Sequence, residues 1–216
     1  KMMTMTTKFD PARLVQLDFN GPSQRFAMTE LQPLAAALAA HVLTEATSVL
    51  YTQQGDQIYV FRTSHFSLYN VMQGLIDGQP WMGTFCAVCN AGMSFSPVVN
   101  GQTLEFYGVG FYDAMALLAD RQTDSYWDHL TGECLHGPFV GTMLPQLTTM
   151  THSTAGQVIK QTPEARFVVT TLTADKVQFE DFAEALRVAP QPQWFPQILS
   201  SLDAEDKRLP RFEMGI

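Results

Sequence analysis

Residues 81–96, Trp-Met-Gly-Thr-Phe-Cys-Ala-Val-Cys-Asn-Ala-Gly-Met-Ser-Phe-Ser, carry the pattern that decides the fold. Residues 81–85 are typical of a buried strand that delivers Cys86 at its end. Residues 90–92 predict a turn, and residues 93–96 alternate in polarity like a strand. In thioredoxin-type enzymes the dithiol instead opens a helix, whose N-terminal dipole lowers the pKa of the first thiol. The stretch therefore argues against a thioredoxin fold, although not against dithiol redox chemistry.

The sequence on either side predicts strands joined by hairpins. Asn100-Gly101 is the pair preferred in type I′ turns, and it links expected strands at 93–99 and 102–108. A second strand pair is expected at 48–51 and 57–62, around Gln54-Gly55-Asp56. These signals indicate a mostly antiparallel sheet. Further short strands are expected at 81–85, 114–118, 134–139 and 167–172.

Helices are expected on both sides of this strand-rich region. Thr29 to Gln32 resembles a capping box, and the apolar spacing after it predicts a helix to Ala40 or Leu43, within a helical segment at 27–43. A further helix is expected over 66–76, ended by Asp77-Gly78-Gln79-Pro80. Two short helices with a proline-broken tail are expected over 175–216. With no internal repeat and no linker, the chain reads as one α+β domain over 1–216, with helices flanking the sheet.

Composition and charge narrow the classes of partner. The 216 residues are 46% apolar, which is enough for a core without disulfide staples. Thirteen basic against 21 acidic residues give a net charge of −8, which disfavours broad contact with nucleic-acid phosphate or anionic lipid. No run of 18 apolar residues exists, so we expect a soluble protein without a membrane span. A single C-x-x-C suits either the cytoplasm or the periplasm, and Lys1 before Met2 leaves open a leader that has been removed.

The pair Cys86 and Cys89 offers the most specific chemistry in the chain. In a redox C-x-x-C, one thiolate attacks a disulfide and the second thiol resolves the mixed disulfide. We expect Cys86 to attack and Cys89 to resolve, with a thiol, disulfide or small-molecule partner that the sequence does not identify. Two buried thiols acting as small apolar side chains are the simpler alternative. In a related reading the pair is a structural clip in a non-catalytic scaffold or ligand-binding domain.

The same cysteines offer a second alternative, a zinc or copper site. A closed tetrahedral site needs four ligands, and the chain has three cysteines, so Cys134 and His136 would join Cys86 and Cys89. On one strand, residues 134 and 136 would present their side chains on the same face. His129 is a further candidate ligand. Plain burial is the simpler explanation for Cys134. In either reading no other cofactor is expected.

Two longer motifs resemble a known family. Thr84 to Phe95 resembles the signature T-Y-C-P-L-C-G-T-A-x-x-F. Asp120 to Glu133, with Gly137-Pro138 and Gly141, resembles the block D-R-Q-T-x-S-x-W-x-x-L-T-G-E-A-x-x-G-P. Both motifs belong to the bacterial domain-of-unknown-function family numbered 3179. The resemblance covers residues 57–172, with the motifs in the family's order and separation.

This resemblance implies redox chemistry, because some relatives carry selenocysteine in the dithiol motif. Cys86 and Cys89 inherit that role. Asp120 and Arg121 are expected to tune the site, and Asp120, Asp128 or Glu133 could transfer a proton if buried beside the thiols. A structural turn, with Asp120 as a cap and Arg121 paired, is the alternative interpretation of Asp120-Arg121. Arg121 or His129 could lower the thiol pKa if the fold brings either of them near.

The chain also departs from the family's pattern. Ala87-Val88 and Asn90 replace Pro-Leu and Gly, and we expect Asn90 to take the left-handed conformation that Gly would adopt. An upstream W-H-E-x-x-N-D motif falls on 68–74, where Tyr69 replaces the histidine. Relatives usually have Ala at position 134. A fainter similarity links Thr151 to Thr171 with organomercurial lyases, which cleave carbon–mercury bonds with two cysteines and a carboxylate.

Overall fold

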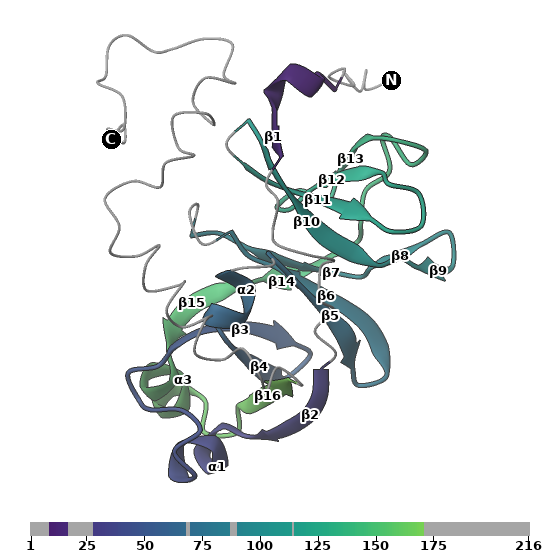
Figure 1. Ribbon diagram of the computed structural model, residues 1–216. Helices are drawn as coiled ribbons and strands as arrows, with labels where there is room; N and C mark the ends of the chain where they lie inside the picture. The colour runs from purple at the N-terminus through teal and green to yellow at the C-terminus, as the bar shows by residue number, and fades with distance from the viewer. Residues whose placement is uncertain (1–8, 17–27, 68–69, 87–89, 114, 171–216) are drawn as a thin grey trace, which may run out of the picture.

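A computed structural model of the protein describes residues 9–16, 28–67, 70–86, 90–113 and 115–170 (Figure 1). These residues form mostly β-strands. In chain order the strands are β1 Leu14–Gln16, β2 Met28–Pro33, β3 Ser48–Gln54, β4 Gln57–Arg62, β5 Val71–Ile76, β6 Gln79–Thr84, β7 Met93–Phe95, β8 Val98–Val99, β9 Gln102–Thr103, β10 Phe106–Tyr112, β11 Met115–Asp120, β12 Tyr126–Asp128, β13 Cys134–His136, β14 Gln146–Thr149, β15 Thr151–Thr154 and β16 Arg166–Thr170. The helices are a 3-10 turn at Pro11–Arg13, α1 Leu34–Ala39, α2 Ser64–Ser67 and α3 Ala155–Gln161.

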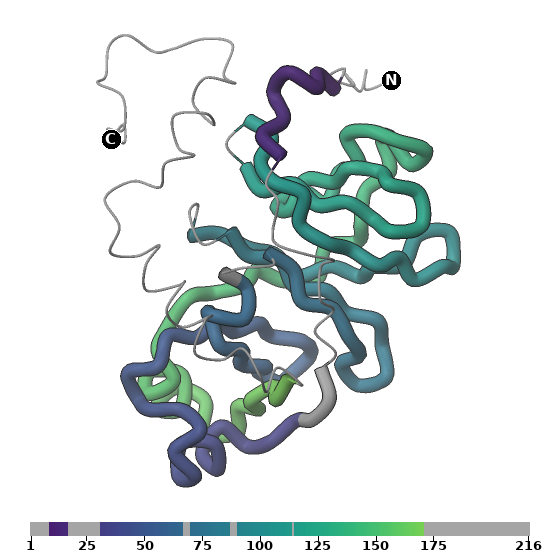
Figure 2. Tube along the Cα trace, viewed as in Figure 1, coloured from purple at the N-terminus to yellow at the C-terminus, as the bar shows by residue number. Residues whose placement is uncertain are grey.

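The strands form three layers (Figure 1). The central sheet has the order β14-β7-β6-β5. An upper sheet, β1-β10-β11-β12-β13, and a lower sheet, β15-β3-β4-β16-β2, lie on either side of it, and β8 and β9 form a separate hairpin. Described strand pairs are antiparallel except β16 with β4. Figure 2 shows the path: after β1 in the upper sheet, the chain builds β2 to β4 of the lower sheet and β5 to β7 of the central sheet. It then completes the upper sheet and returns through β14 to β15, α3 and β16.

The central sheet is buried on both faces, and β6 shows this residue by residue. Trp81 packs into a cluster shared with the lower sheet, where its ring stacks on Phe61 at 5.0 Å. The next residue, Met82, packs into a cluster that includes Phe95 of the neighbouring strand β7 and Trp127 of the upper sheet. A strand covered on both sides reads as a continuous apolar run, which is the pattern seen at 81–85.

The expectation of an α+β domain with flanking helices was wrong. The described helices have only six, four and seven residues. Leu34 of α1 and Val158 of α3 pack with Val60 and Phe167 of the lower sheet in a third cluster. Because the sheets bury much of one another's apolar surface, the fold needs little helix, and it is nearly all β.

Two expected helices proved to be strands for much of their length. Residues 28–33 form β2, which pairs with β16 (Leu31 opposite Val168), and α1 begins only after Pro33. Pairing with a distant strand therefore outweighed the local capping pattern. Residues 71–76 form β5 rather than a helix, and the expected helix end at Asp77-Gly78 is a hairpin turn with φ of +50° and +76° at its two residues. Positive φ at both positions is the type I′ signature.

The hairpin predictions were confirmed. Asn100 and Gly101 take φ of +50° and +78° between β8 and β9. The expected long strands are each broken, into β7 and β8 and into β9 and β10. The turn between β3 and β4 contains Gly55 at φ +59°. Strands β6, β11, β13 and β16 cover most of the other expected positions, and the prediction for 175–216 lies outside the described residues.

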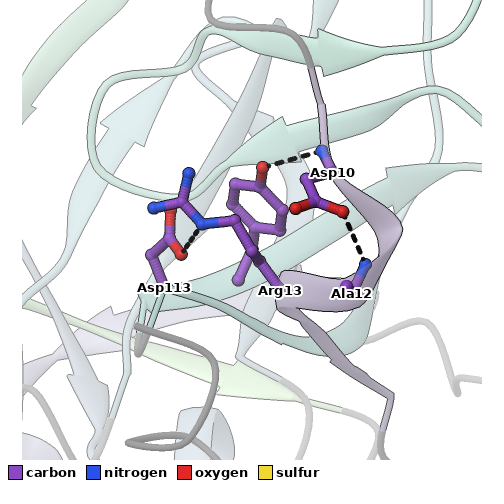
Figure 3. A network of polar contacts seen from close by, with 5 residues as sticks. Asp10, Ala12, Arg13 and Asp113 are labelled. Atoms are coloured by element: carbon purple, nitrogen blue, oxygen red, sulfur yellow. Dashed lines mark hydrogen bonds and ion pairs between the residues drawn. The ribbon is translucent and has the colours of Figure 1, made fainter. Parts of the chain in front are cut away.

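A short N-terminal segment is fastened to the upper sheet (Figure 3). The Arg13 guanidinium pairs with the Asp113 carboxylate at 2.7 Å and lies 5.6 Å from the centre of the Tyr112 ring. The Asp10 N–H donates to the Tyr112 hydroxyl, and the Asp10 carboxylate accepts from the Ala12 N–H. These contacts hold β1 against β10. Within the part of the chain that the structure describes, no helix has the length and apolarity needed to cross a membrane.

Candidate dithiol site

Cys86 lies just beyond β6, where the central sheet turns back. Its side chain is fully buried, and its N–H donates to the Ala91 carbonyl at 2.9 Å. The two residues form an antiparallel bridge that closes the turn. Asn90 is exposed and takes φ +50°, so the left-handed conformation expected there is confirmed. Cys89 belongs to 87–89, outside the described residues.

Three neighbours fix the backbone that leads to Cys86. Asn70 makes two hydrogen bonds to Phe85, the residue before Cys86. The backbone carbonyl of Asn70 accepts the Phe85 N–H at 2.9 Å, and the side-chain amide of Asn70 donates to the Phe85 carbonyl at 3.2 Å. The Thr84 hydroxyl donates to the His129 carbonyl at 2.7 Å. Gly92 packs so closely that a Cβ there would overlap the Thr84 carbonyl oxygen. The end of β6 is therefore held by the residue before β5, by the residue after β12 and by its own return turn.

The described cysteines differ in chemical state. Cys86 is disulfide-bonded, with a partner outside the described residues. Cys134 is a free, buried thiol. Its Sγ donates to the His136 carbonyl at 3.3 Å, and burial raises its pKa to about 11. A thiol with so high a pKa stays protonated and unreactive at neutral pH.

His129 is a fully buried histidine beside the Cys86 turn. Its Nδ1 lies 2.9 Å from the Ala116 carbonyl, so this nitrogen carries the proton of the neutral ring. Nε2 has no hydrogen-bond partner among the described residues, although the adjacent Ala91 backbone raises the pKa of the ring. Burial has the largest effect on the ring and lowers the pKa of His129 below the usual histidine value. The charge of Asp128 and the Ala91 backbone raise this pKa, but by less. The imidazole is therefore neutral at pH 7, with a buried proton acceptor facing the turn.

A second histidine lies on the lower side of the site. The His152 ring centre is 6.4 Å from that of Phe85, and its Nε2 lies 2.7 Å from the Ser48 hydroxyl. The Met150 N–H donates to the Gly92 carbonyl at 3.2 Å, which brings the junction of β14 and β15 against the turn. His152 is exposed, unlike His129.

Asp120 is buried within a turn of its own. Its carboxylate accepts from the Thr123 N–H at 2.7 Å, the Thr123 hydroxyl at 2.9 Å and the Trp127 indole at 2.9 Å. The neighbouring Arg121 is exposed, and its guanidinium lies 5.0 Å from the centre of the Tyr107 ring. These contacts are those of a capped turn with a stacked cation.

Asp120 and the residue that contacts His129 lie at opposite ends of β11, so Asp120 lies away from the Cys86 turn. His129 contacts Ala116 near one end of this strand, and Asp120 is its last residue. Four residues of extended chain span roughly 13 Å. The Asp120 side chain bonds Thr123 and Trp127, and none of its hydrogen bonds within the described part of the chain reaches the turn. Its role with Arg121 in tuning the thiols stays a prediction.

Cys134 and His136 do not share surroundings, contrary to the expectation from alternation. A bulge between β12 and β13 places Cys134 opposite Trp127 and His136 opposite Tyr126, which are consecutive residues. Cys134 therefore faces the core, whereas the exposed His136 ring stacks on Phe9 at 4.8 Å. Across the described ranges, no group of three or more His, Cys, Asp and Glu side chains could hold a metal ion.

Sequence reasoning underrated two of the residues that build this site. His129 was considered only as one of several thiol-tuning or metal-binding candidates, and Asn70 was not considered. Thr84 stands inside the T-F-C-x-x-C motif, which was the available signal for it. Asn70 could not be found this way, because its contact with Phe85 exists only once residues 71–76 pair as a strand.

Comparison with known families identifies the whole region. A family model described as "Protein of unknown function (DUF3179)" matches residues 30–211. The match is longer than the 57–172 expected from the two motifs. No curated protein and no solved structure matches the chain. The similarity to organomercurial lyases is thus no more than a resemblance of one segment.

Proposed function

The chain belongs to the DUF3179 family of proteins of unknown function, and we propose that it is a dithiol/disulfide redox protein working through Cys86 and Cys89. One observation carries the proposal: Cys86 is disulfide-bonded at a strand-end turn, while the third cysteine, Cys134, is a free and buried thiol. The C-x-x-C spacing supplies Cys89 as the natural partner.

The reaction is thiol–disulfide exchange with a partner dithiol. A partner thiolate attacks one sulfur of the pair, the Cys86–Cys89 bond breaks, and a mixed disulfide forms. The partner's second thiol then attacks the partner's own sulfur in the mixed disulfide, and the remaining cysteine of the pair is released as a thiol. The partner loses two electrons and two protons and becomes a disulfide, and Cys86 and Cys89 become two thiols. In the reverse sequence the reduced pair, Cys86 and Cys89, reduces a substrate disulfide to a dithiol and becomes a disulfide again.

The surroundings of Cys86 suit this role. Asn70 and Thr84 hold the backbone on the core side, so the position of Cys86 does not depend on the disulfide itself. His129 adds a neutral proton acceptor nearby. The bonded sulfur therefore lies between a rigid strand and a short turn.

The test is the reduction potential of the pair. The protein is equilibrated in glutathione and dithiothreitol buffers of graded potential, and its thiols are trapped by alkylation and counted by mass. We expect a two-electron transition between about −270 and −120 mV, the range of known dithiol redox proteins. Cys86→Ser and Cys89→Ser should each abolish it, and Cys134→Ser, the matched control, should leave it unchanged. A potential below about −300 mV would instead identify a structural clip.

A further inference from the structure

Residues 9–16, which we call the arm, lie on the upper sheet as a bound peptide would. Strand β1 adds to the edge of β10 in antiparallel register, with Leu14 opposite Tyr112 and Gln16 opposite Gly110. No residue of the arm is buried. The arm is therefore held by pairing at the sheet edge and by partly exposed side chains, which are the contacts that peptides make when they add a strand to a sheet.

The arm places one aromatic ring among three others. The Phe9 ring stacks on the Tyr112 ring at 4.7 Å and on the His136 ring at 4.8 Å, measured between ring centres. It also lies 5.5 Å from the Tyr126 ring. Distances in this range are those of favourable ring pairs. We call Tyr112, Tyr126 and His136 the aromatic site. All three residues are half-buried or exposed, so a ring supplied from outside the chain could reach them if Phe9 were absent.

A carboxylate beside the aromatic site selects the charge of what binds there. The Asp113 carboxylate lies 2.7 Å from the Arg13 guanidinium, and these side chains are 27% and 26% exposed. The same guanidinium lies 5.6 Å from the centre of the Tyr112 ring (Figure 3). The Tyr112 hydroxyl accepts the Asp10 N–H at 3.1 Å. With its net charge of −8, the chain as a whole also favours a basic partner over an acidic one.

We propose that the aromatic site, Asp113 and the edge of β10 form a docking site for a peptide segment of a partner protein. The segment carries an aromatic residue, a basic residue four positions later and a short strand after it, as the arm does with Phe9, Arg13 and β1. The arm occupies this site within its own chain and competes with the partner. The docking site lies on the upper sheet and takes no part in the dithiol chemistry of the proposed function.

Competition by the arm limits how strongly such a segment binds. A segment tethered to its own site competes at a high effective concentration. A peptide in solution therefore binds only the fraction of molecules whose site is vacant. The variant Phe9→Ala/Arg13→Ala removes the two side chains that anchor the arm, and it should vacate the site without altering it. The residues of the site stay in place in this variant: Tyr112, Tyr126, His136 and Asp113.

The test is the binding of a fluorescent peptide with the sequence of the arm, Phe-Asp-Pro-Ala-Arg-Leu-Val-Gln, to the full chain, read by fluorescence anisotropy. Wild type and Phe9→Ala/Arg13→Ala are compared, with further peptides in which Ala replaces the Phe or the Arg. Adding Asp113→Asn to the double variant removes the carboxylate that pairs with the Arg of the peptide. Asp124→Asn is the matched control, because Asp124 also lies in a turn of the upper sheet, with φ of +55° against +52° at Asp113.

We expect the double variant to bind the peptide about tenfold more tightly than the wild type, the factor that holds when the arm fills its site nine-tenths of the time. Loss of the peptide's Phe or Arg, or Asp113→Asn, should weaken binding about threefold or more, and Asp124→Asn should leave it unchanged. Thermal melts confirm the fold of each protein, and Phe9→Ala alone, with a smaller gain, replaces the double variant if that one is unstable. Absence of binding to a folded vacated variant, equal binding to the wild type, or binding that the Asp113 and peptide changes leave unaltered would overturn the docking site.

Discussion

The Cys86 N–H and the Ala91 carbonyl lie 2.9 Å apart, and this single bond closes the turn that carries the dithiol motif. Ala91 lies near His129, and Gly92 contacts both Thr84 and Met150. The end of the turn therefore lies between the upper and lower sheets. The C-x-x-C segment is therefore tied to the core through the residues that follow it, Ala91 and Gly92.

Replacing Gly92 should damage this turn most severely. A Cβ at Gly92 would overlap the Thr84 carbonyl oxygen, which is backbone and cannot move aside. We expect Gly92→Ala to cost about 3 kcal/mol or more of unfolding free energy, measured by urea denaturation. Gly101→Asn is the control, since that position is open and Asn tolerates its φ of +78°. Equal stability of the two variants would show that the turn can rearrange.

Asn70 should matter more than its place at the start of a strand suggests. Asn70→Ala removes a donor from the buried Phe85 carbonyl and puts alanine at φ +58°. We expect a loss of about 2–3 kcal/mol. Asn90→Ala at φ +50° isolates the conformational part, because Asn90 is exposed, and should cost only about 1 kcal/mol. A similar cost in both variants would mean that the Phe85 contact contributes nothing.

The buried histidine should make stability depend on pH. The pKa of His129 is lowered in the folded protein, so the unfolded chain binds its proton first as the pH falls. The stability from the neutral ring is complete above about pH 6.5 and declines as the pH drops toward the folded-state pKa. Between pH 7.5 and 5, His129→Asn should lose less unfolding free energy than the wild type. A larger loss in the variant would mean that the sign of this shift is wrong.

Asp120 can be tested for structure and for tuning in one variant. Asp120→Ala leaves the Trp127 indole and the Thr123 donors unpaired, so we expect a cost of about 3 kcal/mol and a change in tryptophan fluorescence. If the carboxylate is only a turn cap, the dithiol potential should stay the same. A shift of about 30 mV or more would support the predicted tuning role.

Cys134 should be inert in the native protein. Burial raises its pKa to about 11, so almost none of it is thiolate at pH 8. Iodoacetamide should add no label to the folded, oxidised protein within an hour, as read by intact mass, and one label once it is unfolded in urea. Labelling of the folded protein would show that the core around Trp127 opens readily.

Local sequence patterns predicted the turns well and the layers poorly. Asn100-Gly101 and the left-handed Asn90 follow from backbone preferences of single residues, which act without tertiary context. The strands at 28–33 and 71–76 form by pairing with other strands, β16 and β6. At both places the local pattern predicted a helix, from a capping pattern in the first and a mixed apolar run in the second. Asp77-Gly78 carried the correct hairpin signal but was interpreted as the end of a helix.

The candidate site divides in the same way. Cys86 and Thr84 belong to one continuous motif and could be recognised without a structure. Asn70, which precedes β5, and His129, which follows β12, are brought to that motif only by the pairing and stacking of the sheets. The bulge that separates Cys134 from His136 cannot be seen in an alternating sequence, and for this reason the expected shared face was wrong.

The burial of β6 on both faces has a consequence for how a change in the bonding of Cys86 would reach the rest of the fold. Amide hydrogens in such a strand exchange with solvent chiefly when the whole molecule opens, so they report global rather than local unfolding. Cys86 follows directly on that strand. A bond made or broken at Cys86 therefore acts directly on the end of this buried strand. Oxidation and reduction should therefore change the lifetime of the entire folded state, which makes hydrogen exchange along 79–84 a direct record of the redox history of the protein.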